Sequence, residues 1–206
     1  TGFDVERIDA SHQITAVAAQ SVTAVASPSP GSVLAYTAGP LALDEYLASP
    51  SAITLDATYG VSGSAALPGK VAPMPASALT VDSSARALVA LPSASIARLL
   101  PNGALDATWG AGGVAPLLGG DAHATWVRAL SSGGAVALGR VSDGTWFVTA
   151  LSQSGEATPF GTFGRTLLCP SCVGDAMAVD ETEKRVCVAQ ESPLSNPFVA
   201  CYRLGP

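Results

Sequence analysis

The stretch Leu-Asp-Ala-Thr-Tyr-Gly at residues 55–60 returns as Leu-Asp-Ala-Thr-Trp-Gly at residues 105–110. A weaker copy, Glu-Ala-Thr-Pro-Phe-Gly, occupies residues 156–161. The aromatic residue of this six-residue phrase stands at positions 59, 109 and 160, so the phrase repeats at steps of 50 and 51 residues. Repeats with a period of about 20–50 residues are typical of solenoids, propellers and arrays. The phrase therefore decides the fold class.

Four repeat units of similar length follow from alignment on this phrase, within one predicted domain of residues 1–206: residues 1–51, 52–102, 103–154 and 155–206. In the third unit, Gly133-Gly134 and Asp143-Gly144 mark hairpin turns between short apolar segments. Four strands in about 50 residues are the size of one propeller blade. The sequence thus predicts an all-β propeller of four-stranded antiparallel blades, with about four blades in this chain.

The ends of the chain join in phase with the repeat, which favours either a closed four-blade ring or part of a larger ring. An open arc of four blades is less favoured, because it exposes apolar faces. No segment has the 3.6-residue periodicity of an amphipathic helix. Residues 41–51 are the one segment whose pattern leaves room for a short helical turn.

Composition excludes several classes of function. The chain is 48% hydrophobic and 13% charged, with a net charge of −6, and its eight arginines are scattered singly, so we expect no nucleic-acid binding. No uncharged apolar run reaches the length of a membrane helix, despite a mean hydropathy of +0.37. The chain begins with Thr and shows no signal peptide, which we interpret as a piece processed or excised from a longer protein.

All four cysteines lie in the last quarter of the chain: Cys169, Cys172, Cys187 and Cys201. This even count favours disulfides in an oxidising compartment, while a four-sulfur zinc site and free thiols stay open as alternatives. Cys187 and Cys201 fall on the last two predicted strands, where opposed positions would allow a cross-strand disulfide.

Residues 103–114, Gly-Ala-Leu-Asp-Ala-Thr-Trp-Gly-Ala-Gly-Gly-Val, resemble the signature of the bacterial delta-sixty-type β-propeller repeat family. A closing Arg-Leu pair of that family also appears, as Arg98-Leu99 and as Arg203-Leu204. The match covers the second and third units well, the fourth in part and the first poorly. It implies a β-propeller in a secreted or surface-associated bacterial protein, and it implies no reaction.

The phrase itself has a structural interpretation. Its Asp is expected to accept hydrogen bonds from nearby backbone amides, and its glycines are expected to adopt positive φ. Tyr59 and Trp109 are expected in the core between blades. Chemistry, if the chain has any, should therefore lie where the copies disagree.

Three polar residues outside the repeated phrase are weak catalytic candidates: Asp121, His123 and Arg128. A carboxylate two residues from an imidazole could serve acid–base chemistry, and such a site in the central channel would indicate a hydrolase or lyase. An exposed loop histidine is the simpler interpretation, since no third partner is identifiable. We expect no metal site and no cofactor, because no ligand spacing or cofactor motif is present.

Trp126 and Trp146 are weak candidates for ligand-binding surfaces. Trp146 is followed by Phe147, and neighbouring residues of a strand point to opposite faces, so both rings are also expected in the core. Lacking a catalytic motif, the sequence favours a secreted or surface-associated binding protein over an enzyme. It would bind a protein or carbohydrate through loops at one end of the ring, without a membrane span. A homodimer or a second fragment of a longer propeller is a further possible partner.

Overall fold

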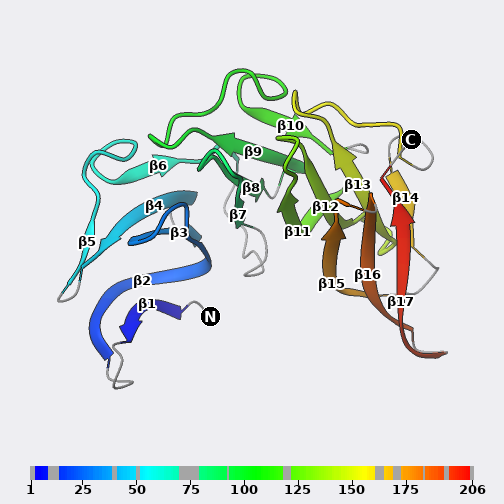
Figure 1. The fold of residues 1–206 in the computed structure, drawn as a ribbon, viewed down its shortest axis with the longest axis horizontal. Helices are drawn as coiled ribbons and strands as arrows, with labels where there is room; N and C mark the ends of the chain where they lie inside the picture. Colours follow the sequence, from blue (N-terminus) through cyan, green and yellow to red (C-terminus); the bar gives the residue numbers. More distant parts are fainter. Residues whose placement is uncertain are drawn as a thin grey trace.

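The computed structural model describes residues 3–8, 14–38, 41–49, 52–69, 79–91, 93–117, 122–160, 165–168, 173–182, 184–192 and 195–204. Every regular element in these ranges is a β-strand, and the strands form four antiparallel sheets (Figure 1). Among the described residues there is no helix of the length and apolarity needed to span a membrane.

The first sheet contains β1 Phe3–Ile8, β2 Ile14–Ala26, β3 Ser32–Ala38, β4 Leu41–Ala48, β5 Ile53–Leu55 and β6 Ser64–Ala66. The second contains β7 Leu79–Val81, β8 Ala87–Leu91, β9 Ser95–Leu99 and β10 Val114–Pro116. The third contains β11 His123–Ala129, β12 Ala135–Arg140, β13 Trp146–Leu151 and β14 Arg165–Leu167. The fourth contains β15 Val173–Asp180, β16 Arg185–Ser192 and β17 Ser195–Arg203.

Strand β4 corrects the short helical turn that the sequence left room for in residues 41–51. Residues 41–47 of this segment pair with β3, from Ser32 opposite Leu47 to Ala38 opposite Leu41. On its other side it pairs with β5 and β6. These ladders satisfy the backbone hydrogen-bonding groups that a helical turn would otherwise have satisfied internally.

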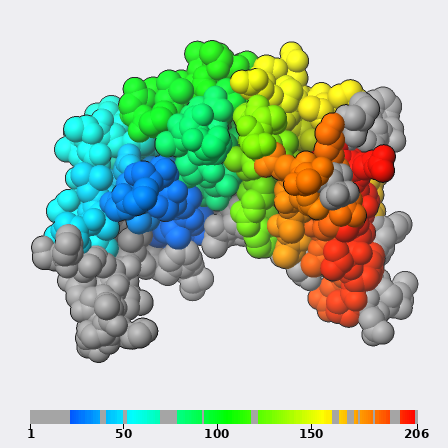
Figure 2. Space-filling model, viewed as in Figure 1, coloured from blue at the N-terminus to red at the C-terminus, as the bar shows by residue number. Residues whose placement is uncertain are grey.

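The four sheets follow one another in an open arc, and the described chain forms no closed ring (Figures 1 and 2). Each sheet contacts the next: β2 packs against β7, β11 against β7 and β8, and β15 against β11 and β12. Strand β1 pairs with β2 in its own sheet, from Phe3 opposite Val22 to Ile8 opposite Ile14. Among the described residues the expected closed four-blade ring is therefore not formed, because this strand pairs with β2 and not with the fourth sheet.

Each of the first three sheets receives a strand from the residues after the next copy of the phrase. Strand β10 follows the phrase at residues 105–110, yet it pairs with β9 of the second sheet, with Val114 opposite Ala97. In the same way β6 pairs with β4, and β14 pairs with β13. The described part of the fourth sheet ends at β17. A copy of the phrase therefore lies where two sheets meet, and it links them.

Three apolar clusters fill the spaces between consecutive sheets. Tyr59 and Trp109 are 2% and 0% exposed, which confirms the core positions predicted for the aromatic residues of the phrase. Phe147 packs in the cluster between the second and third sheets, and Trp146 in the cluster between the third and fourth. The prediction that these neighbours point to opposite faces of one strand is also confirmed.

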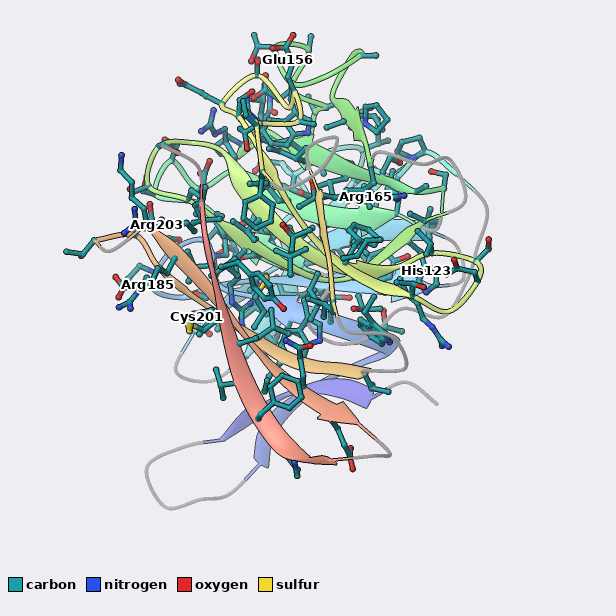
Figure 3. The ribbon with its side chains drawn as sticks, turned by 90° about the vertical axis from the view of Figure 1, so that its right-hand side faces the viewer. His123, Glu156, Arg165, Arg185, Cys201 and Arg203 are labelled. Atoms are coloured by element: carbon teal, nitrogen blue, oxygen red, sulfur yellow. A yellow bond between two sulfur atoms is a disulfide. The ribbon has the colours of Figure 1, made fainter. Side chains whose placement is uncertain are left out.

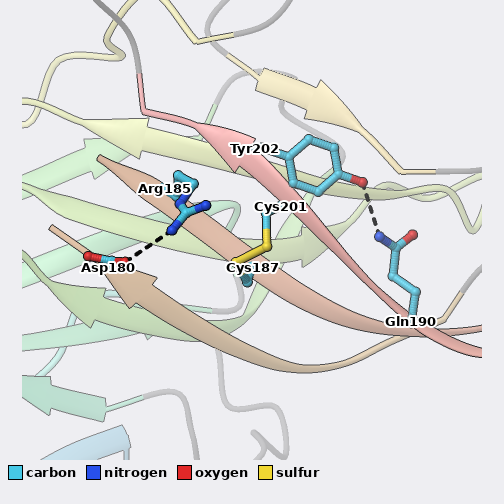
Figure 4. The surroundings of a disulfide bond; sticks show 6 residues. All are labelled: Asp180, Arg185, Cys187, Gln190, Cys201 and Tyr202. Carbon is cyan, nitrogen blue, oxygen red and sulfur yellow. Dashed lines mark hydrogen bonds and ion pairs between the residues drawn. A yellow bond between two sulfur atoms is a disulfide. The ribbon is translucent and has the colours of Figure 1, made fainter. Parts of the chain in front are cut away.

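A disulfide joins Cys187 on β16 to Cys201 on β17, at directly opposed positions of the ladder (Figure 4). The predicted cross-strand disulfide is confirmed, and it is incompatible with a zinc site that uses all four sulfurs as thiolates. Gln190 Nε2 donates to the Tyr202 hydroxyl at 3.0 Å across the same pair of strands. Cys169 and Cys172 lie outside the described residues.

Candidate functional site

The catalytic candidates of the sequence are not brought together by the described residues. His123 begins β11 with an exposed side chain opposite Arg140, and Figure 3 shows it on the far side of the molecule from Arg185 and Arg203. Arg128 lies near the other end of β11, on the order of 15 Å away along the strand. Asp121 lies outside the described residues, so the acid–base hypothesis stays a prediction.

Trp126 and Trp146 both pack at the edge of the cluster between the third and fourth sheets, and both are half-buried. The Arg128 guanidinium lies 5.8 Å from the centre of the Trp126 ring, within the range of a cation–π contact. The two tryptophans thus belong to one region of the molecule, and their proposed role in ligand binding stays a prediction.

The Asp of the phrase binds its own turn, as the sequence predicted. The backbone N–H of Thr58 donates to Asp56 Oδ1 at 2.9 Å, and that of Thr108 donates to Asp106 Oδ1 at 3.0 Å. Gly60 has φ of 56°, a left-handed conformation that glycine adopts without strain. The local turn therefore explains these residue types without any chemistry.

The two copies of the phrase at residues 55–60 and 105–110 lie beside different side chains in the spaces between the sheets. Between the second and third sheets the side chain of Arg98, only 1% exposed, makes the contacts that we call the Arg98 site. Its Nε donates to Asp106 Oδ2 at 2.8 Å. Its Nη1 donates to the carbonyl oxygens of Gly133, at 3.0 Å, and of Gln153, at 3.1 Å. Its guanidinium stacks 4.3 Å from the centre of the Trp109 ring.

Electrostatics in the Arg98 site favour the charged pair. Burial alone would raise the pKa of Asp106, but the hydrogen bonds from Thr108 and the charge of Arg98 outweigh it and hold this pKa below its usual value. For Arg98, burial and the nearby Arg86 lower the pKa, while Asp106 opposes that shift. An arginine titrates so far above neutrality that Arg98 stays protonated at neutral pH.

Strand register corrects the closing Arg-Leu pair on which the resemblance partly depends. In the second sheet, Ala85 is the left-handed residue of the hairpin turn, and Leu88 follows it by three residues. Leu88 pairs with Arg98. Three residues after the left-handed Lys184 comes Cys187, and its partner is Cys201 rather than Arg203. Arg203 has an exposed side chain (Figure 3). The disulfide thus occupies in the fourth sheet the pair of positions that Leu88 and Arg98 occupy in the second.

A pocket of about 130 Å³ lies between the first and second sheets, at the end where the loops and the phrase meet. We call it the Glu45 pocket. Its lining residues are Pro28, Ser29, Leu34, Glu45, Tyr59, Ala85, Ala87, Leu100 and Pro101. Most of this lining is apolar or small, and Glu45 is the one carboxylate in it.

Two polar side chains give the Glu45 pocket its chemistry. Glu45 Oε1 accepts a hydrogen bond from the Ser32 hydroxyl. The Tyr59 hydroxyl is buried and has no hydrogen-bond partner among the described residues. Burial, followed by the charges of Glu45 and Asp44, raises the pKa of Tyr59, so the phenol stays protonated. The pocket wall therefore carries negative charge, and the unpartnered Tyr59 hydroxyl is buried behind that wall.

Tyr59→Phe is expected to leave the stability of the chain unchanged or to raise it by about 1 kcal/mol, because it removes a buried hydroxyl that lacks a partner. Tyr202→Phe is the matched control. It removes the acceptor of the Gln190 side chain and is expected to lower the free energy of unfolding by about 1–2 kcal/mol. Denaturant unfolding of both variants measures the difference. A larger fall in the free energy of unfolding for Tyr59→Phe than for Tyr202→Phe would contradict the conclusion that the Tyr59 hydroxyl lacks a partner.

Sequence reasoning missed both the Arg98 site and the Glu45 pocket. Arg98 was noticed only as half of a closing pair, and Glu45 was not singled out. A signal was nevertheless present, because the corresponding position carries Glu45, Arg98, Ala150 and Cys201 in the four sheets. This is a position where the copies disagree.

Four antiparallel sheets packed face to face in an arc define a propeller-like all-β protein. No family model matches the chain, and no curated protein matches it. Among solved structures, the chain is similar to one described as "Streptogramin B lyase structure", with a TM-score of 0.44 and 12% sequence identity. The match covers 89% of this chain and 54% of the other, so the chain spans about half the length of that structure.

Proposed function

We propose that this chain is a propeller-like binding module of a secreted or surface-associated bacterial protein, with repeats of the delta-sixty type. It takes a protein partner at the loop end where the Glu45 pocket opens. The disulfide between Cys187 and Cys201 supports an oxidising compartment. The sequence resemblance supports the bacterial surface.

The observation that carries this proposal is the Glu45 pocket itself. Its volume of about 130 Å³ is well below the roughly 300–1,000 Å³ of sites that enclose a whole small-molecule ligand. A space of this size fits one side-chain-sized group that projects from a larger partner. Loops from two sheets surround it, with Ser29 from the first sheet and Pro101 from the second. Among the partners considered, a protein supplies such a group more readily than a glycan does.

Ser29→Trp is expected to weaken partner binding strongly, because a large ring at the exposed rim covers the Glu45 pocket. The chain is used to select from a displayed library of random linear peptides and is applied in parallel to a glycan array. We expect the unmodified chain to enrich peptides and the Ser29→Trp variant to lose at least about tenfold in affinity for them, as expected when a central pocket contact is removed.

Ser132→Trp is the matched control, since Ser132 is exposed in the corresponding loop of the third sheet. This variant is expected to bind the selected peptides as the unmodified chain does. Binding to glycans alone would overturn the choice of a protein partner. Equal binding by both variants would place the site away from the Glu45 pocket.

A further inference from the structure

The Glu45 pocket and the Arg98 site are built on the same backbone framework. The N–H of Asp56 donates to the Glu45 carbonyl at 2.8 Å, and the N–H of Asp106 donates to the Arg98 carbonyl at 2.9 Å. The N–H groups of Glu45 and Arg98 donate in turn to the carbonyls of Gly63 and Gly113, at 3.2 and 2.9 Å. Glu45 therefore stands in the first sheet where Arg98 stands in the second.

The opposite wall of each space comes from the following sheet, and it too is equivalent. Ala85 and Gly133 are the left-handed residues of corresponding turns, with φ of 58° and 82°. The N–H of Gly60 donates to the Asn102 carbonyl, and the N–H of the equivalent Gly110 donates to the Ser154 carbonyl. Asn102 and Ser154 therefore correspond, and so do the residues that precede them, Pro101 and Gln153. Arg98 donates to the carbonyls of Gly133 and Gln153. Their counterparts, Ala85 and Pro101, both line the Glu45 pocket.

The aromatic wall is shared as well. Trp109, on which the Arg98 guanidinium stacks, corresponds to Tyr59 in the phrase, and Tyr59 lines the pocket. The indole Nε1 of Trp109 donates to the Ile96 carbonyl at 3.3 Å, whereas the Tyr59 hydroxyl has no partner among the described residues. The two spaces differ most in charge and size at the Arg98 position, where the first sheet has the shorter and oppositely charged Glu45.

We propose that the Glu45 pocket binds a guanidinium group, and hence an arginine side chain of the protein partner. The bound group would lie where the Arg98 guanidinium lies one sheet further on. Its N–H groups would donate to the Glu45 carboxylate and to the carbonyls of Ala85 and Pro101, and it would lie against the part of Tyr59 that lines the pocket. The inference rests on the proposed function, since it names the chemistry that the same pocket recognises.

A guanidinium fits this wall better than an ammonium or a neutral amide does. It is planar, it carries five N–H donors in a fixed fork, and it is weakly hydrated, so it can stack on a ring and serve acceptors on two sides at once. A carboxylate in the wall gives charge-assisted hydrogen bonds, which are about twice as strong as neutral ones. A neutral group of the same shape loses the charge, and an ammonium loses the planar fork of donors.

The test uses three small probes on the purified chain: methylguanidinium, methylammonium and N-methylurea, which is the neutral analogue of the first. Binding is measured by NMR titration and by the shift in Tm. We expect methylguanidinium to bind more tightly than either of the other probes by at least about tenfold, the value of one charge-assisted hydrogen bond. Glu45→Gln is expected to weaken methylguanidinium binding by at least about tenfold.

Glu45→Arg gives a second measurement that does not depend on a soluble ligand. The new side chain reproduces the Arg98 arrangement inside the chain, so we expect a higher Tm and no remaining binding of methylguanidinium. A lower Tm together with unchanged binding would overturn the proposal. Equal affinity for methylammonium would show a general cation site and would also overturn it.

The guanidinium proposal and the proposed function fail separately. Suppose that Ser29→Trp weakens peptide binding as expected, but methylguanidinium does not bind and the selected peptides keep their affinity when Arg is replaced by Gln. The proposed binding function is then supported, and the guanidinium inference is wrong. If methylguanidinium binds as expected but no peptide is selected, the guanidinium chemistry of the pocket is supported and the proposal of a protein partner is wrong. Support for both requires an arginine in the selected peptides whose replacement by Gln removes binding to the unmodified chain.

Discussion

Arg98→Met is expected to lower the free energy of unfolding by about 3–5 kcal/mol, the usual cost of removing one partner of a buried ion pair. Three acceptors lose the N–H groups of Arg98 at once: Asp106 Oδ2, which keeps only Arg86 at 3.8 Å, and the carbonyl oxygens of Gly133 and Gln153. Methionine keeps much of the apolar volume beside Trp109, so the loss reports the polar contacts rather than a cavity. For a chain of this size the Tm should fall by roughly 6–20 °C, at about 2–4 °C per kcal/mol.

Chemical denaturation of Arg98→Met and of the control Arg203→Met measures both free energies of unfolding. The comparison separates the loss of the buried contacts of Arg98 from the effect of replacing any arginine by methionine. Arg203 is exposed, and its replacement should change the free energy of unfolding by no more than about 0.5 kcal/mol. A loss below about 1 kcal/mol for Arg98→Met would contradict the Arg98 site as a stabilising contact between the second and third sheets.

The pH dependence of the same variant has a defined sign. The pKa of Asp106 is lowered in the folded chain, so this group contributes stability above its unfolded pKa of about 3.9, and that contribution is lost as pH falls through the folded value. Removing Arg98 takes away one cause of the lowered pKa. The difference in stability between the unmodified chain and Arg98→Met should therefore shrink as the pH falls below about 4.

Gly110→Ala is expected to lower the free energy of unfolding by about 3 kcal/mol or more, through left-handed strain and a lost backbone hydrogen bond. Gly110 has φ of 53°, and an added Cβ would lie 2.2 Å from the Val114 carbonyl oxygen. That atom belongs to the backbone of β10 and cannot rotate away. The shift needed would also break the hydrogen bond from the Gly110 N–H to the Ser154 carbonyl, 2.7 Å long.

Gly112→Ala is the control for conformational strain alone. Gly112 has φ of 64°, yet a Cβ added there would meet nothing within 4 Å. Its replacement should cost only about 1 kcal/mol, the penalty for a side chain in the left-handed region. Thermal unfolding of the two variants measures the difference. Equal losses would mean that the close approach of Gly110 to β10 does not constrain the phrase.

Much of the fold was predictable from short-range pattern. The 50-residue repeat, the antiparallel hairpins and the buried aromatic residues follow from spacing and turn chemistry, which act within a few residues. The disulfide between Cys187 and Cys201 was predictable for the same reason, since both cysteines lie on one hairpin. The pairing of β1 with β2 was not, because the repeat phase alone does not choose between two partners for an edge strand.

The candidate site shows the opposite balance. Asp121 and His123 were chosen because they are close in sequence, while the Glu45 pocket joins Glu45 to Ala85 and Pro101 across two sheets. Likewise the Arg98 side chain reaches acceptors 35 and 55 residues away along the chain. Contacts of that separation leave no trace in local spacing.

By itself, the sequence determined the repeat and the turns within it, because the phrase is a local structure held by its own Asp and glycines. The tertiary structure decided what each phrase encloses. The framework between consecutive sheets is the same, but the side chain at one position of it is Glu45 in the first sheet and Arg98 in the second. Whether that space is filled from within or offers a pocket depends on walls from two sheets, and only packing brings those walls together.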